Sequence, residues 1–183
     1  MRTLIFIFLS LPFLLAQVGK ITFSSSPSFE LSYSISSDTL TMTLVASNSG
    51  YLAIGFGSLD MTNADCTYLA FSNGIGIVED GYSTSEVKPT AYSTSHTKIL
   101  SATRTGGVST FKVERKLNPG LGKTYTIDPN SNVKMTWALG RSDTYDQHSN
   151  EGSVTVNFAK ATSSSLGRMV FGLISILLML FLY

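Results

Sequence analysis

The sequence predicts an all-β domain, either a sandwich or a barrel, built from about ten strands. Two observations support this prediction. Short segments rich in Ser, Thr, Tyr, Val and Phe recur along the middle of the chain, and clusters of turn residues separate them. No long stretch with helical periodicity interrupts these segments, which argues against a parallel α/β fold.

The candidate strands are residues 20–24, 29–35, 39–46, 51–57, 67–71, 74–79, 98–103, 109–116, 134–139 and 153–158. The turns that separate them include Asn48–Gly50, Ser72–Gly74, Thr105–Gly107, Asn118–Gly120 and Asp128–Asn130. Residues 39–46 alternate strictly, with Leu40, Met42 and Leu44 on one face, as in a half-buried strand. Residues 51–57 are apolar on both faces, so we expect a central strand whose glycines allow close backbone approach.

The first sixteen residues have the composition of a secretory signal peptide. One basic residue, Arg2, precedes a long apolar run that ends at a small residue, Ala16. The run begins at the initiator Met and has no polar face, which favours a cleaved leader over a buried element of the fold. We expect residues 1–16 to be removed, and the mature protein to follow the secretory pathway to the cell surface or the extracytoplasmic face of a membrane.

Residues 169–183 form a second apolar run, which ends with the given sequence. As a helix this run would be about 22 Å long at ~1.5 Å per residue, which is short against the ~30 Å core of a bilayer. The preceding residues, 161–168, are small or polar, as at a GPI-attachment site. We expect a lipid anchor in 161–168 with loss of the tail, and a short transmembrane segment is the alternative.

Residues 17–160 are sufficient for one domain with its own core. The formal net charge of the chain is +1, and without a basic stripe no nucleic-acid partner is expected. The single cysteine, Cys66, cannot form an internal disulfide, so stability must come from the core. Because Cys66 lies in a strand-like run, we expect it to be a buried small hydrophobe and not a reactive thiol.

Local sequence signatures of common enzymes are absent. The chain has no H-E-x-x-H, G-x-S-x-G or P-loop sequence, so we do not expect an enzyme. A single cysteine also excludes cysteine-rich zinc and iron–sulfur sites within one chain. The remaining candidate metal ligands are His96, His148 and Met61, although loop histidines are more often solvated and such methionines more often pack.

Four blocks of sequence occur in an order that indicates a family. They are Gly50-Tyr-Leu-Ala-Ile-Gly-Phe-Gly57 with Met61 and Ala64-Asp65, then Tyr82-Ser83 with Pro89, then Phe111 with Arg115-Lys-Leu117, and finally Trp137-Ala-Leu-Gly140 with His148. Each block alone is weak evidence for a family. Their order and spacing together resemble the DOMON family over roughly residues 29–158.

The resemblance implies an immunoglobulin-like antiparallel β-sandwich with a ligand pocket. In cytochrome members of that family the pocket holds haem b between the methionine of the first block and the histidine of the last. Those positions are Met61 and His148 here, so the resemblance implies that both ligate haem iron. No C-x-x-C-H sequence is present, so the haem would be held non-covalently. His96 lies outside the blocks, and we expect it at the surface.

The chemistry of this pair agrees with a haem site. A soft thioether and an imidazole suit iron, and two filled axial positions favour electron transfer over oxygen activation. Met61 follows the strand at 51–57 and His148 follows the strand at 134–139. If these strands run in the same direction, both residues emerge at the same end of the sandwich.

The surroundings of the pocket are less specific. Phe56, Leu59 and Phe71 are candidates for an apolar wall. The alternative function is a non-redox module that binds carbohydrate or another small ligand, because Tyr82, Tyr92 and Tyr145 would give an aromatic pocket with a polar rim. For the redox function we expect a separate redox protein or a small reductant as partner, together with attachment to a membrane through the C-terminal tail.

Overall fold

The computed structural model describes residues 16–160. It consists of strands joined by turns and loops, and the described residues include no helix. The strands are β1 (Gln17–Ser25), β2 (Ser28–Ser36), β3 (Thr39–Ala46), β4 (Leu52–Phe56), β5 (Ala64–Ser72), β6 (Ile75–Ser83), β7 (Thr90–Ala91), β8 (Thr97–Thr105), β9 (Val108–Lys116), β10 (Val133–Gly140) and β11 (His148–Val156). The predicted signal peptide and the predicted anchor lie outside the described residues, apart from Ala16.

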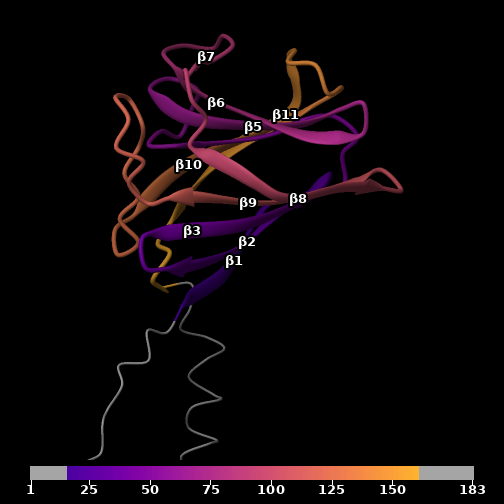
Figure 1. Cartoon of the computed structure of the whole chain (residues 1–183). Coiled ribbons are helices and arrows are strands. Elements are labelled where there is room, and N and C mark those ends of the chain that lie inside the picture. The colour runs from indigo at the N-terminus through magenta and orange to yellow at the C-terminus, as the bar shows by residue number, and fades with distance from the viewer. Residues whose placement is uncertain (1–15, 161–183) are drawn as a thin grey trace, which may run out of the picture.

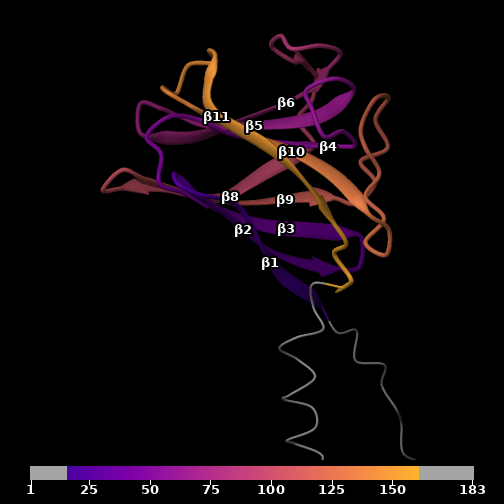
Figure 2. The ribbon, with the colours of Figure 1, turned by 180° about the vertical axis from the view of Figure 1, so that it is seen from behind.

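The strands form two antiparallel sheets. The first has the order β1-β2-β3-β9-β8 and the second the order β11-β10-β4-β5-β6-β7. Figures 1 and 2 show the two sheets as layers packed face to face, so the predicted all-β sandwich is confirmed. The connections after β6 and β10 project from the outer side of the second sheet (Figure 1).

The hydrophobic core lies between the sheets. Leu40, Met42 and Leu44 of β3 are fully buried there, whereas the threonines that alternate with them are not, as the pattern predicted. Aromatic rings fill one part of this space, and the rings of Phe29 and Trp137 pack edge to face at a centroid distance of 5.8 Å. Because each strand turns alternate residues to opposite faces, the other face of each sheet is left for solvent or for ligands.

Strand β4 lies between β10 and β5 in the second sheet, which confirms that residues 51–57 include a central strand. Leu52, Ile54 and Phe56 point into the core and are 0–1% exposed. Between them, Ala53 and Gly55 turn to the outer face of the sheet. Two small residues in the middle of the sheet therefore leave its outer face without large side chains at this point.

The structure corrects three features of the predicted strand map. The short strand β7 was missed, since its two residues are too few for a recognisable alternation. Strand β11 begins at His148, which was expected in a loop. Strands β4 and β10 are antiparallel neighbours, with Met135 opposite Phe56 and Leu139 opposite Leu52. The condition under which both residues would emerge at the same end of the sandwich is therefore not met.

Within residues 16–160, no helix has the length and apolar character needed to cross a membrane.

Candidate functional site

A cavity of about 600 Å³ lies against the outer face of the second sheet. This volume is within the ~300–1,000 Å³ range of small-molecule and cofactor pockets. Its floor includes the small residues Ala53, Gly55, Ala138 and Gly152. A Cβ atom added at Gly55 would lie 2.7 Å from the Thr136 methyl group, so the sheet surface has no room for a side chain there. The cavity therefore exists because three adjacent strands, β4, β10 and β11, carry small residues at these positions.

Three connecting segments form the walls of this cavity. They are residues 57–63 between β4 and β5, residues 84–89 between β6 and β7, and residues 141–147 between β10 and β11. The first carries Met61, and the third leads directly into His148. Both residues line the cavity although β4 and β10 are antiparallel, because the segments lie over the face of the sheet and not only at its ends.

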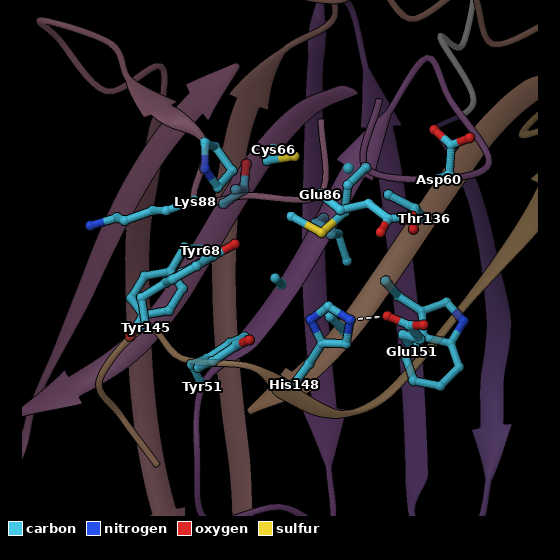
Figure 3. Close-up of a pocket in the computed structure, with 18 of the residues that line it drawn as sticks. Tyr51, Asp60, Cys66, Tyr68, Glu86, Lys88, Thr136, Tyr145, His148 and Glu151 are labelled. Atoms are coloured by element: carbon cyan, nitrogen blue, oxygen red, sulfur yellow. Dashed lines mark ion pairs between the residues drawn. The ribbon is translucent and has the colours of Figure 1, made fainter. Parts of the chain in front are cut away.

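Three tyrosines make up one side of the cavity (Figure 3). The ring of Tyr145 is stacked on that of Tyr51, with an interplanar angle of 6° and a centroid distance of 5.7 Å. The ring of Tyr68 lies 4.9 Å from that of Tyr51. Burial raises the pKa of Tyr51, and it raises that of Tyr68 to about 12. Both therefore remain neutral phenols that donate hydrogen bonds.

Those hydrogen bonds hold the segment 141–147. The Tyr51 hydroxyl donates to the backbone carbonyl of Asp146 at 2.9 Å, and the Tyr68 hydroxyl donates to the carbonyl of Asp143. The Asp143 carboxylate accepts two hydrogen bonds from Arg104 of β8, at 2.6 and 2.8 Å. It also accepts the backbone N–H of Phe71 at 3.0 Å. Side chains from both sheets therefore fix the segment that precedes His148.

The bond with Arg104 changes the acidity of Asp143. Hydrogen bonding to the Arg104 guanidinium lowers the pKa of this carboxyl, against a smaller opposing effect of burial. Asp143 therefore stays ionised well into the acidic range. The polar sequence Arg141–Gln147 is accordingly an anchored segment and not simply a hydrated rim.

His148 is the first residue of β11 and is paired with Gly140, the last residue of β10. Its side chain is 22% exposed, and its Nε2 atom forms an ion pair with the Glu151 carboxylate, drawn as a dashed line in Figure 3. Glu151 itself is 64% exposed. A histidine that is mostly covered, lines a cavity and has a carboxylate beside it is in a suitable environment for a metal ligand.

Met61 lies in a segment that is held mainly by its own turn. The Asp60 carboxylate accepts the backbone N–H of Thr62 at 2.7 Å and the hydroxyl of Ser58 at 3.0 Å. The segment starts at Gly57, whose φ of 93° is in the left-handed region that favours glycine. An added Cβ at Gly57 would also meet the Tyr125 ring at 2.7 Å. The thioether is thus presented on a tight, largely exposed loop.

Of the other residues predicted near the site, Leu59 and Tyr145 line the cavity. The remaining four do not. Phe56 is in the inter-sheet core beneath the Arg115 guanidinium, Phe71 packs on Phe111, Tyr82 donates to Asn63, and Tyr92 donates to Asp65. Phe56 and Phe71 belong to the inner layer because strand alternation turns them inward, which sequence composition alone does not show.

Cys66 lies on the cavity wall and is only half-buried, so the expected full burial is not observed. Burial nevertheless raises the pKa of its thiol to about 12, and the nearby carboxylates of Asp65 and Asp80 raise it further. The thiol is therefore protonated at neutral pH, in agreement with the prediction that it is not reactive.

His96 is not a surface residue, contrary to expectation. Its side chain is 4% exposed and lies between two buried carboxylates, with Nε2 3.4 Å from Asp65 and Nδ1 3.8 Å from Asp80. The backbone N–H groups of His96 and Thr97 both donate to Asp80. The prediction failed because the two carboxylates beside His96 are distant from it in sequence and lie on β5 and β6.

Asp65 and Arg115 form an ion pair between the two sheets. They come from β5 and β9, are each 1% exposed, and approach to 3.2 Å. Burial opposes ionisation of Asp65, but hydrogen bonding from His96 and the charge of Arg115 outweigh it and lower the pKa of the carboxyl. Two of the sequence blocks thus meet in one buried pair.

Among the described residues, no group of three or more His, Cys, Asp or Glu side chains is arranged to hold a metal ion.

Comparison with known families agrees with this architecture, since the DOMON domain model matches residues 25–140. The chain belongs to the DOMON family. Met61, Asp65 and Arg115 lie inside the matched region, whereas His148 lies just beyond it.

One relative of this DOMON chain is the cytochrome b561, DM13 and DOMON domain-containing protein of Arabidopsis thaliana. It is 36% identical over 104 residues, which cover 50% of this chain and 11% of the relative. The chain therefore corresponds to only a small part of that protein.

Two solved structures share the fold. The cytochrome b domain of pyranose dehydrogenase from Coprinopsis cinerea matches with a TM-score of 0.62, at 14% identity over 78% of this chain and 83% of that one. The cytochrome domain of cellobiose dehydrogenase from Myriococcum thermophilum matches with a TM-score of 0.63, at 14% identity over 82% and 88% of the two chains.

Proposed function

We propose that this DOMON domain binds haem b non-covalently, with Met61 and His148 as the axial ligands, and transfers single electrons to or from a separate partner. The observation that carries the proposal is that these two residues line one cavity on the outer face of the second sheet. They come from segments that are distant in sequence, and side chains from both sheets hydrogen-bond the segment that leads to His148.

The residues that line the cavity are suited to holding haem b. The sheet offers a floor of small residues, and the cavity volume of about 600 Å³ is suitable for a cofactor. A thioether and an imidazole are an established donor pair for haem iron in electron-transfer proteins. Both structural neighbours are cytochrome domains, and the relative from Arabidopsis is named for a cytochrome b561 domain, which supports the same assignment.

When bound, haem would supply a one-electron couple, and Met/His ligation favours a high reduction potential. The side chains of this chain would fix its position and cover it. His148 would use a ring nitrogen for the iron, and ligation through Nε2 would take the place of its pair with Glu151. Tyr51, Tyr68 and Tyr145 would form one apolar side and exclude water. With Met61 and His148 both bound to the iron, the domain would act as an electron carrier and not as an enzyme.

The experiment is haem titration of the purified protein followed by spectroscopy of the reduced form. We expect a low-spin, six-coordinate spectrum that is lost in Met61→Ala and in His148→Ala. Cys66→Ser and His96→Gln are matched controls, because they remove the other cavity sulfur and the other histidine. A wild-type protein that takes up no haem, or spectra unchanged in both ligand variants, would contradict the proposal.

A carbohydrate-binding module is the second candidate function. The stacked rings of Tyr51 and Tyr145 and the carboxylates of Asp60, Glu86 and Asp146 line the same cavity, an aromatic and polar combination that suits a sugar. A glycan array run on the preparation used for haem titration separates the two. Saturable glycan binding by a protein that takes up no haem would favour the module.

We further propose that residues 17–160 form the mature domain and that it is exposed outside the cytoplasm. The supporting observations are the leader-like residues 1–16 and the apolar residues 169–183. Phosphatidylinositol-specific phospholipase C applied to intact cells distinguishes the two modes of attachment. Release would identify a lipid anchor, whereas retention with recovery of Tyr183 by mass spectrometry would identify a transmembrane tail.

A further inference from the structure

The charges around the cavity are unevenly distributed. Four of the residues that line it are carboxylates exposed to solvent, namely Asp60, Glu86, Asp146 and Glu151. Lys88 is the sole Lys or Arg among the lining residues. The whole chain has a formal net charge of +1, so this negative excess is a local feature of one face.

Lys88 offsets little of that excess. Its ammonium forms an ion pair with Glu79 of β6 at 3.2 Å and lies over the ring of Tyr145 at 5.6 Å. The lysine therefore already has a carboxylate partner outside the rim. Glu151 is likewise paired, with His148, so the field at the mouth of the cavity is that of Asp60, Glu86 and Asp146.

Two large apolar side chains are exposed on the same face. Leu59 is 45% exposed on the segment 57–63, and Val87 is 61% exposed on the segment 84–89. Both line the cavity, so they lie on two of its walls. Exposed apolar side chains bordered by charged groups are typical of a protein-binding surface.

We propose that this face is the docking surface for a separate redox protein, and that the partner presents basic residues around an apolar centre. The redox nature of the partner rests on the function proposed above, whereas its charge and its apolar centre rest on the rim itself. Complementary charge would steer the two proteins together, and Leu59 and Val87 would form the apolar contact from which water is excluded. Haem held by Met61 and His148 would supply the electron that the oxidised centre of the partner takes up.

The test uses the haem-free protein, so it does not depend on haem binding. Mitochondrial cytochrome c serves as a basic redox protein, and calorimetric titrations are run at low and at high ionic strength. We expect binding at low salt that weakens as the salt concentration rises, because charges that are exposed in the free proteins are screened. Leu59→Ser is expected to weaken binding at both salt concentrations.

A matched pair of triple variants identifies the face. One variant neutralises the rim, with Asp60→Asn, Glu86→Gln and Asp146→Asn. The other removes the same number of charges from the first sheet and its turn, with Glu30→Gln, Asp38→Asn and Glu114→Gln. The rim variant should lose at least ~10-fold in affinity at low salt, and the control should stay within ~2-fold of wild type.

Three results would overturn the docking surface: equal losses in both triple variants, binding that does not respond to salt, or no binding of cytochrome c. Rim-dependent binding of spermine without binding of cytochrome c would identify a small cation in place of a protein. Failure of the haem proposal would appear instead as absence of the haem spectrum, with the docking titration unaffected.

Discussion

The two segments that present the candidate ligands are held in different ways. Residues 141–147, which lead to His148, are bonded along their length by Tyr51, Tyr68 and Arg104. Residues 57–63, which carry Met61, are held in the middle by their own Asp60 turn, at the start by the Gly57 N–H, which donates to the Lys134 carbonyl, and at the end by Asn63, which accepts from Tyr82. One wall of the cavity is therefore built into both sheets, and the other is a loop fixed at its ends.

This difference suggests that the two candidate ligands behave differently when a cofactor binds. A side chain on a fixed segment is already in position before a cofactor binds, and little entropy is lost when it does. A thioether on an exposed loop that both sheets do not fix can adjust its position to complete the coordination. Changes on the His148 side should therefore affect both stability and binding, whereas changes in the middle of the Met61 loop should affect binding alone.

The largest expected effect is at the base of the Met61 loop. Arg115→Met should lower the free energy of unfolding by about 3–5 kcal/mol, because it leaves the buried Asp65 carboxylate without its cationic partner. Urea denaturation followed by tryptophan fluorescence measures this. The double variant Asp65→Leu with Arg115→Met should be less destabilised, since both charges of the pair are removed together. A double variant at least as unstable as the single one would show that the pair itself stabilises the fold.

The next effect is on the His148 side. Arg104→Ala removes hydrogen bonds to Asp143 and to the Gly50 carbonyl, so we expect a loss of about 2–3 kcal/mol in the free energy of unfolding. Haem affinity should fall as well, because the segment before His148 is released. Lys98→Ala on the same strand is the control and should stay within ~0.5 kcal/mol of wild type. Unchanged haem affinity in Arg104→Ala would contradict the proposed link between anchoring and binding.

Much of the fold could be predicted from the sequence because strand signals are local. The alternation of Leu40, Met42 and Leu44 identified the half-buried strand β3, and the doubly apolar residues 51–57 identified the central strand β4. The relative direction of β4 and β10 could not be predicted, since it depends on which strands pair across the sheet. The sandwich was therefore predictable, but the placement of the cavity on its outer face was not.

The anchoring of the His148 segment should also respond to acid. The Arg104 guanidinium lowers the pKa of Asp143 in the folded protein, so the carboxylate contributes stability that is fully present above its unfolded pKa of ~3.9. That contribution is lost as the pH falls through the lower, folded pKa. An NMR titration of Asp143 should give a midpoint below the ordinary value, and Asp143→Asn should reduce the acid dependence of unfolding. A midpoint at or above ~3.9 would contradict the role of Arg104.

Two residues of the candidate cavity could be predicted from the sequence, and its surroundings less so. Met61 and His148 were identified from their place in the family blocks, and both line the cavity. His96 was misplaced because its burial depends on Asp65 and Asp80, which reach it only through the packing of β5 and β6. Such long-range partners leave no periodic signal near the residue itself.

The smallest expected effect is in the middle of the Met61 loop. Asp60→Ala removes the acceptor of the Thr62 N–H and the Ser58 hydroxyl, but both groups are at the surface, where water can replace the lost acceptor. We therefore expect an unchanged urea midpoint, together with faster hydrogen exchange at the Thr62 amide. If the loop only needs to adjust, haem should still bind, with a larger fraction of five-coordinate iron as Met61 becomes less well placed. A drop in the urea midpoint comparable to that of Arg104→Ala would show that the two walls are equally built into the fold, and the distinction between a fixed histidine and an adjustable methionine would fail.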